Sequence, residues 1–135
     1  MNNNSRKTIL VADDNEDSRI LLRTFLEAEG YRVLEAENGI EAVLVAEQEI
    51  PDLILMDLNM PVLDGISAAR HIRTLVKLCK IPILANSADG QRGIDLFSDI
   101  NKFGKAYIGY IPKPLSFDEL TEQINLALFK IKKAA

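Results

Sequence analysis

Carboxylate side chains follow two short apolar runs in this sequence. Asp57 comes directly after the uninterrupted run at 53–56, and Asp13 and Asp14 come directly after a run at 8–12. Such a run is typical of a strand covered on both faces in a parallel sheet, although periodicity alone does not distinguish it from a buried helical segment. An open α/β sheet binds its ligands at the carboxyl ends of its strands. We therefore take Asp57 as the candidate chemical centre, although a lone aspartate at this point also commonly begins a turn.

Two further apolar runs end in side chains that would complete such a site. Ser87 closes the run that begins at residue 81, and Lys113 closes the run that begins at residue 106. The carboxyl ends of parallel strands lie on one edge of the sheet, so both side chains should lie near Asp57. Any one of these residues could be a solvated loop or cap residue. Their joint position at strand ends favours one shared site.

The chemistry of this set of residues follows from its charges. Three carboxylates within about 5 Å repel by roughly 3 kcal/mol per pair at an effective dielectric constant near 20, so the cluster needs a cation. Oxygen ligands alone favour Mg²⁺, with Mn²⁺ as a substitute, whereas Zn²⁺ is disfavoured because no Cys or His accompanies the acids. A carboxylate beside Mg²⁺, an ammonium group and a hydroxyl is suited to phosphoryl transfer. The predicted product is an aspartyl phosphate on Asp57.

The strand ends belong to a regular alternation of strands and helices. Strands are expected at five apolar runs, at residues 8–12, 31–36, 53–56, 81–85 and 106–111. Helices are expected where apolar residues recur at helical spacing, at residues 21–28, 42–46, 69–76, 96–103 and 120–128. This alternation implies right-handed crossovers and a parallel sheet with helices on both faces. The sequence therefore predicts an α/β, doubly wound, three-layer domain.

Local signals refine these elements. Asn15 or Asp17 is expected to cap the first helix, Gly30 to end it, and Ser116 with Glu119 to form a capping box before the last helix. The residues expected to face inward on the first and third helices are Leu21, Leu22, Phe25 and Ala28, and Ala69, Ile72, Leu75 and Val76. Pro112 indicates an edge position for the last strand, because proline cannot donate to a neighbouring strand.

Composition narrows the class of protein. The chain has 135 residues, a formal net charge of −4 and one cysteine, Cys79. The scattered charges do not indicate nucleic-acid binding. The polar start is not a signal peptide, and no apolar run approaches the roughly 20 residues of a membrane span. We expect a soluble, cytoplasmic protein with no nucleic-acid partner and no membrane insertion. It should have a disordered tail at residues 1–6, one domain at residues 7–132 and no effector domain.

The combined motifs resemble a known family. Asp13-Asp14, the sequence DLNMPVLDG from residue 57, Ser87-Ala88 and Lys113-Pro114 stand at the intervals found in receiver domains of two-component response regulators. The layout is similar to that of single-domain chemotaxis regulators, and the resemblance covers residues 7–132. It implies a flavodoxin-like fold with strand order 2-1-3-4-5.

The resemblance also implies a role for each residue. Asp57 would accept a phosphoryl group from a phosphohistidine on a sensor histidine kinase or a histidine phosphotransfer protein. Asp14 and Asp57 would bind Mg²⁺ directly, together with the backbone carbonyl of Asn59, while Asp13 would bind it through water. Lys113 would pair with the phosphoryl oxygens, and its peptide bond to the following proline is expected to be cis.

The implied output is a change of surface. The Ser87 hydroxyl would move to the phosphoryl group as Tyr110 moves inward, although Tyr107 is a second candidate for this aromatic switch. The charge added by phosphorylation would then shift the face formed by the fourth helix, fifth strand and fifth helix, where a downstream protein binds. Ser87 replaces the commoner Thr, and Asn86 is more polar than is usual at its position.

Two other functions are compatible with parts of the pattern. One is a receiver-like docking module that signals without phosphorylation, which the complete acid set argues against. The other is a Mg²⁺-dependent phosphohydrolase of the haloacid dehalogenase type, which also uses an aspartate at a strand end. Those enzymes require a second aspartate two residues later, where this chain has Asn59, and the chain leaves no room for a cap domain.

Overall fold

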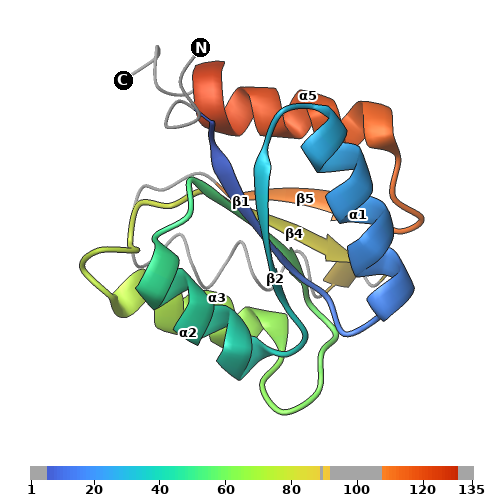
Figure 1. Cartoon of the computed structure of the whole chain (residues 1–135). Coiled ribbons are helices and arrows are strands. Elements are labelled where there is room, and N and C mark those ends of the chain that lie inside the picture. Colours follow the sequence, from blue (N-terminus) through green and yellow to red (C-terminus); the bar gives the residue numbers. More distant parts are fainter. Residues whose placement is uncertain (1–5, 89, 92–107, 131–135) are drawn as a thin grey trace.

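A five-stranded parallel sheet forms the centre of the protein (Figure 1). The computed structural model describes residues 6–88, 90–91 and 108–130. The strands are β1 (Thr8–Ala12), β2 (Arg32–Ala36), β3 (Leu53–Asp57), β4 (Ile83–Ser87) and β5 (Ile108–Pro112). Their order is β2-β1-β3-β4-β5, with parallel pairing throughout. The flavodoxin-like order implied by the resemblance and the edge position of the strand that ends at Pro112 are both confirmed.

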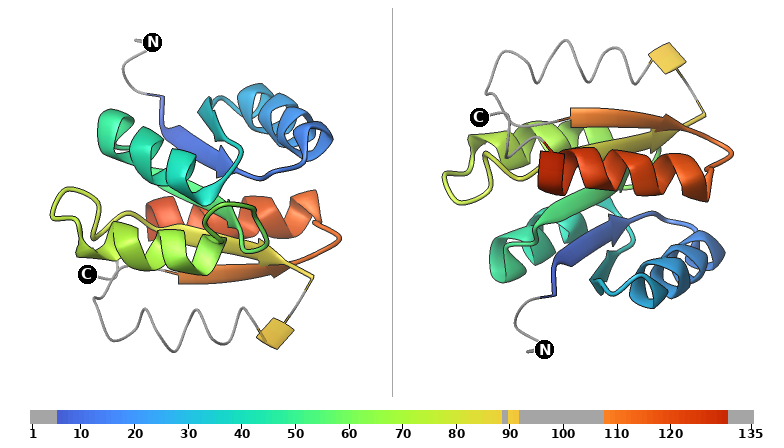
Figure 2. Two further views of the ribbon diagram at one scale, coloured as in Figure 1. Left: turned by 90° about the horizontal axis from the view of Figure 1, so that it is seen from below. Right: turned by 90° about the horizontal axis from the view of Figure 1, so that it is seen from above.

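Helices cover both faces of this sheet (Figure 2). The described helices are α1 (Glu16–Ala28), α2 (Gly39–Glu49), α3 (Gly65–Thr74) and α5 (Phe117–Asn125), which continues into the π-helical turn η2 (Leu126–Lys130). α2 and α3 pack on one face, whereas α1, α5 and η2 pack on the other. The predicted three layers are therefore present. The helix expected at residues 96–103 lies outside the described residues. No helix in the described part of the chain is long and apolar enough to span a membrane.

β3 shows how the alternation of side chains builds two cores from one strand. Ile54 and Met56 pack under α2 and α3, while Leu53 and Leu55 pack under α1 and α5. All five residues of β3 are buried, which is why this strand reads as an unbroken apolar run. The strand that ends at Asp57 is thus held from both sides.

The predicted capping residues lie where they were expected. The Asn15 side chain accepts a hydrogen bond from the Ser18 N–H at the start of α1, and the Ser116 hydroxyl accepts one from the Glu119 N–H at the start of α5. Gly30 has a φ of +98° and ends α1, where its N–H donates to the Glu27 carbonyl. These local signals could be read from the sequence because each involves neighbours along the chain.

Three inward positions were predicted wrongly. α3 ends at Thr74, so Val76 lies beyond the helix and is 91% exposed. On α1, Leu21 is 57% exposed and Ala28 is also exposed, while Leu26 is fully buried. A stripe of apolar residues indicates a helix face but not its width, and the neighbouring elements decide which residue at its margin is covered.

Arg73 is a buried charge that the sequence did not indicate. Its guanidinium donates to the backbone carbonyls of Leu78 (3.3 Å) and Ile81 (2.7 Å), and so ties the end of α3 to the connection into β4. Burial lowers the pKa of Arg73 to about 10, so the group stays charged at neutral pH. The side chain therefore anchors the segment that leads to Ser87.

Candidate functional site

β1 delivers two acidic residues to the carboxyl edge of the sheet. Asp13 is 3% exposed and Asp14 is exposed. The Asp13 N–H donates to the Ala36 carbonyl at the end of β2 (3.0 Å), and Asp13 Oδ1 accepts the N–H of Asn15 (2.9 Å). The turn that starts α1 therefore holds the acid pair at the edge of the sheet.

The loop after β3 packs closely against the start of α3. The Leu58 N–H donates to the Asn86 carbonyl, and the Gly65 N–H donates to the Leu58 carbonyl, both at 3.1 Å. A Cβ on Gly65 would lie 2.3 Å from the Asp57 carbonyl oxygen and 2.7 Å from Leu58 Cα. Only glycine allows this approach, so the helix start braces the backbone that carries Asp57.

Both carboxylate oxygens of Asp57 have a partner. The Asn59 N–H donates to Oδ1 (3.0 Å), and Lys113 Nζ lies 3.1 Å from Oδ2. The Asp57 side chain is 4% exposed and that of Lys113 is 35% exposed, so the ion pair lies at the mouth of the site. Lys113 is in turn positioned by its own N–H, which donates to the Ser87 carbonyl (3.1 Å). Its peptide bond to Pro114 is cis, as the resemblance implied.

The three acids meet as the sequence predicted. Asp13, Asp14 and Asp57 each offer a carboxylate oxygen within 4.8 Å of the others. Burial raises the pKa of Asp13, and the charges of Asp57 and Asp14 raise it further, while the Asn15 N–H and Lys113 act in the opposite direction. The single ammonium group of Lys113 does not balance three carboxylates. A hard divalent cation such as Mg²⁺ fits this all-oxygen donor set.

Asp13→Asn is expected to stabilise the metal-free protein by roughly 1 kcal/mol at neutral pH. The variant removes a buried charge but keeps the side-chain oxygen that accepts the Asn15 N–H. Because burial and the neighbouring carboxylates raise the folded-state pKa of Asp13, the gain in stability should be full at neutral pH and shrink as the pH falls towards the ordinary aspartate pKa of 3.8. Thermal unfolding at several pH values measures this gain. An equal or lower stability at neutral pH would contradict it, and added Mg²⁺ should stabilise the wild type more than the variant.

The end of β4 contributes a buried hydroxyl residue. Ser87 is fully buried, and its backbone carbonyl accepts the hydroxyl of Tyr110 at 2.7 Å. Tyr110 is half-buried on β5, where it packs against the core that lies under α2 and α3. The structure thus connects the two residues named as a switch pair. Tyr107, the other candidate aromatic, lies outside the described residues.

A pocket of about 340 Å³ opens beside the acid cluster. Its lining combines polar and apolar side chains from the end of β1, from α1, from β4, and from the segment between β5 and the start of α5: Asp13, Ser18, Leu21, Leu22, Asn86, Lys113, Pro114, Leu115 and Phe117. Leu21, predicted to lie in the core, instead forms part of this wall. Asn86 donates its side-chain N–H to the Ile111 carbonyl (2.8 Å), which explains how an amide can be 4% exposed at this position.

The loop between β3 and α3 contains a strained residue. Val62 has a φ of +70° and is 76% exposed. A β-branched side chain is disfavoured in this left-handed region, at a cost of about 1–2 kcal/mol, and the exposed valine gains little from packing. The conformation therefore depends on the neighbouring contacts of this loop.

Val62→Asn is expected to raise the free energy of unfolding by about 1 kcal/mol, because asparagine tolerates a positive φ. Val76→Asn is the matched control, since Val76 is also exposed but is not among the described residues with a positive φ. Chemical denaturation measures both. An equal change in the two variants would show that surface polarity, and not relief of strain, is responsible.

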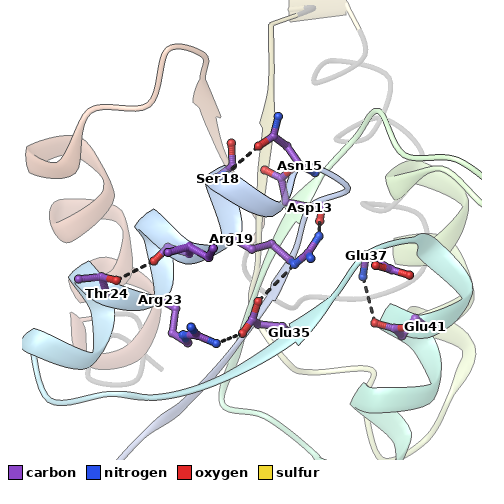
Figure 3. Close-up of polar contacts among 10 residues, drawn as sticks. Asp13, Asn15, Ser18, Arg19, Arg23, Thr24, Glu35, Glu37 and Glu41 are labelled. Atoms are coloured by element: carbon purple, nitrogen blue, oxygen red, sulfur yellow. Dashed lines mark hydrogen bonds and ion pairs between the residues drawn. The ribbon is translucent and has the colours of Figure 1, made fainter.

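Three residues near the acid pair were not identified from the sequence. Arg19, Arg23 and Glu35 form a polar network between α1 and β2, and Arg19 also contacts the backbone of Asp13 (Figure 3). Their only signal in the sequence is the position of Arg19 and Arg23 one helical turn apart. The partner on β2 becomes visible only when the chain folds.

Comparisons with known proteins agree with this geometry. The family model described as the response regulator receiver domain matches residues 9–125. The polar-differentiation response regulator DivK of Brucella anthropi is 33% identical over 119 residues, which are 88% of this chain and 94% of DivK. The receiver domain of the sensor histidine kinase PA1611 from Pseudomonas aeruginosa has a magnesium ion coordinated in its active site cleft. It is 33% identical with a TM-score of 0.79, over 92% of this chain and 98% of that one.

A chemotaxis protein is similar in fold. CheY4 of Vibrio cholerae has a TM-score of 0.82 over 92% of this chain and 100% of that chain. The sequence identity is 24%, so this similarity shows the shared fold alone. In this chain, the sheet of that shared fold positions the cluster of Asp13, Asp14 and Asp57 at its carboxyl edge.

Proposed function

Because the chain belongs to the receiver-domain family of two-component response regulators, we propose that it accepts a phosphoryl group on Asp57 in a Mg²⁺-dependent reaction. Receiver domains are signalling domains that interact with histidine kinases and downstream targets, and are not enzymes of the classical kind. The observation that carries the proposal is the Asp57 carboxylate itself. It is buried at a strand end, paired with Lys113 at 3.1 Å, and within 4.8 Å of the carboxylates of Asp13 and Asp14.

The proposed donor is a phosphohistidine on a sensor histidine kinase or a histidine phosphotransfer protein. An Asp57 carboxylate oxygen forms the new bond to phosphorus while the bond from phosphorus to the donor's imidazole nitrogen breaks. The Lys113 ammonium group, which donates a hydrogen bond to Asp57 Oδ2 before the transfer, then pairs with the oxygens of the transferred phosphoryl group. Water later cleaves the acyl phosphate, which returns inorganic phosphate and the free carboxylate.

Mg²⁺ would be held by Asp14, Asp57 and the Asn59 backbone carbonyl, with Asp13 acting through water. When bound, it offsets the charge that three carboxylates and a phosphoryl group place in one site. The Asn59 N–H bond to Asp57 Oδ1 supports this assignment, since it keeps the Asn59 backbone beside the acid cluster.

The output would start at Ser87 and Tyr110. The added phosphoryl oxygens are acceptors for the Ser87 hydroxyl, and a shift of Ser87 would move the carbonyl to which the Tyr110 hydroxyl now donates. Tyr110 would therefore report the state of the site along β5 and towards α5; the fourth helix of the expected output face, at residues 96–103, lies outside the described residues. A downstream protein that binds this face would sense phosphorylation through a difference in affinity between the two states.

The experiment that tests the proposal is intact-mass analysis after incubation with acetyl phosphate, with Mg²⁺ and with a chelator. A single phosphoryl adduct that requires Mg²⁺ supports a phosphoacceptor. No adduct and no released phosphate, from a folded protein that binds Mg²⁺, would favour a docking module that works without phosphorylation. Rapid turnover of unrelated phosphate esters would favour a phosphohydrolase instead.

A further inference from the structure

The guanidinium of Arg19 lies between the ends of β1 and β2 (Figure 3). Its Nη1 donates to the Asp13 backbone carbonyl at 2.7 Å, and its Nε donates to Glu35 Oε1 at 3.2 Å. The Arg19 side chain is only 11% exposed. One side chain from α1 therefore connects the acid pair to the neighbouring strand.

Glu35 orients this contact. Its other carboxylate oxygen pairs with Arg23, one turn further along α1, so the carboxylate is held by two guanidinium groups. A guanidinium is planar and presents its donors in a rigid fork. The bond from Nε to Glu35 consequently fixes the plane of Arg19 and directs Nη1 at the Asp13 carbonyl.

The Asp13 carbonyl belongs to the peptide unit that leads into Asp14. On its other side, the Asp13 N–H donates to the Ala36 carbonyl, so the backbone is bonded both before and after this residue. Within the part of the chain that the structure describes, the Asp14 side chain has no hydrogen bond or ion pair of its own. The place of its carboxylate in the cluster therefore depends on its backbone.

We propose that Arg19 is a positioning residue that sets the Asp14 carboxylate for cation binding, by holding the peptide between Asp13 and Asp14. This inference rests on the proposed Mg²⁺ site. Arg19 is not itself proposed as a ligand of the cation. It acts through the backbone, with Glu35 as its support.

Charge alone predicts the opposite effect, which makes the proposal testable. Arg19 is a positive group near a site for a divalent cation, so removing its charge should strengthen Mg²⁺ binding if electrostatics were its only influence. Loss of positioning should weaken Mg²⁺ binding instead. Partners that orient a metal ligand typically contribute on the order of 10-fold or more to affinity.

The test is an amide NMR titration with Mg²⁺ of the wild type, Arg19→Met and Arg23→Met. Arg19→Met should raise the dissociation constant on the order of 10-fold. Arg23→Met is the matched control, because it removes the same charge from the same glutamate but leaves the Arg19 bonds to Glu35 and to the Asp13 carbonyl in place, so it should bind Mg²⁺ clearly more tightly than Arg19→Met. Arg19→Lys keeps the charge but not the fork, and it should also weaken binding.

A double-variant comparison shows whether Arg19 acts through Asp14. Asp14→Asn should weaken Mg²⁺ binding, and adding Arg19→Met to that variant should have little further effect. Thermal unfolding and amide spectra of each metal-free variant confirm that it is folded. If Arg19→Met fails to fold, Arg19→Lys and Glu35→Gln carry the same comparison.

Two results would overturn the inference in distinguishable ways. If the wild type binds Mg²⁺ and Asp14→Asn weakens it, but Arg19→Met binds as tightly as Arg23→Met, Arg19 is not a positioning residue and the metal site stands. If the wild type shows no Mg²⁺-dependent shifts near Asp14 and Asp57, the proposed metal site and this inference both fail.

Discussion

Asp57→Asn should abolish the Mg²⁺-dependent phosphoryl adduct, so that its intact mass stays that of the unmodified chain at every acetyl phosphate concentration. The amide has no anionic oxygen to attack phosphorus, and it removes one of the three charges that favour a cation. The other residues of the site remain, so the loss would isolate Asp57 as the acceptor. Intact mass, with peptide mapping of the wild-type adduct, measures the effect.

Asp52→Asn is the matched control for this prediction. Asp52 precedes the opposite end of β3, where its Oδ2 accepts the Thr8 N–H at 2.8 Å, so it is an aspartate on the same strand but away from the site. This variant should carry the adduct as the wild type does. A persistent adduct in Asp57→Asn would show that another side chain accepts the phosphoryl group, and the proposed role of Asp57 would be wrong.

Gly65→Ala is expected to cost about 3 kcal/mol of stability, which corresponds to a fall of roughly 10 °C in the unfolding midpoint. The new Cβ would lie 2.3 Å from the Asp57 carbonyl oxygen and 2.7 Å from Leu58 Cα, both of them backbone atoms that cannot rotate away. Alanine is the better helix former by about 1 kcal/mol, but this gain is smaller than the cost of the collision. To fit, the loop that carries Asp57 must move away from the start of α3.

The same substitution should therefore slow phosphorylation even where the protein is still folded. Gly90→Ala is its control, because no heavy atom of the described residues lies within 4 Å of a Cβ placed at Gly90, and this variant should change neither property. Thermal unfolding and the rate of adduct formation at a temperature well below both midpoints separate the two effects. A Gly65→Ala variant with unchanged stability would show that the helix start does not brace the loop.

Much of this site was predictable because its residues are marked by local sequence patterns, namely apolar runs and the residues that end them. A strand buried on both faces needs an uninterrupted apolar run, and each functional residue lies at or next to the end of such a run. Parallel strands place those ends on one edge, so the meeting of Asp13, Asp14, Asp57 and Lys113 follows from the alternation of elements alone. The helix caps at Asn15 and Ser116 were predictable for a similar reason, since each bonds a neighbour three residues away. The strand order itself came from the family resemblance.

The contacts that hold the site in place were not predictable in this way. The Arg19 side chain donates hydrogen bonds to Glu35 and to the Asp13 carbonyl, and the Asn86 side chain donates one to the Ile111 carbonyl. Each of these bonds joins elements that loops or helices separate in the sequence. The exposure of Leu21 and Val76 likewise depends on which neighbours cover a helix margin.

The sequence by itself thus determined which candidate side chains meet and at which edge of the sheet they meet, because periodicity and strand ends are properties of neighbouring residues. Only the tertiary structure decided how they are held. The need for glycine at position 65 is an example. It arises because the folded chain brings the backbone of Asp57 and Leu58 too close to Gly65 to leave room for a Cβ. Distances between elements are set by packing, which no local pattern encodes.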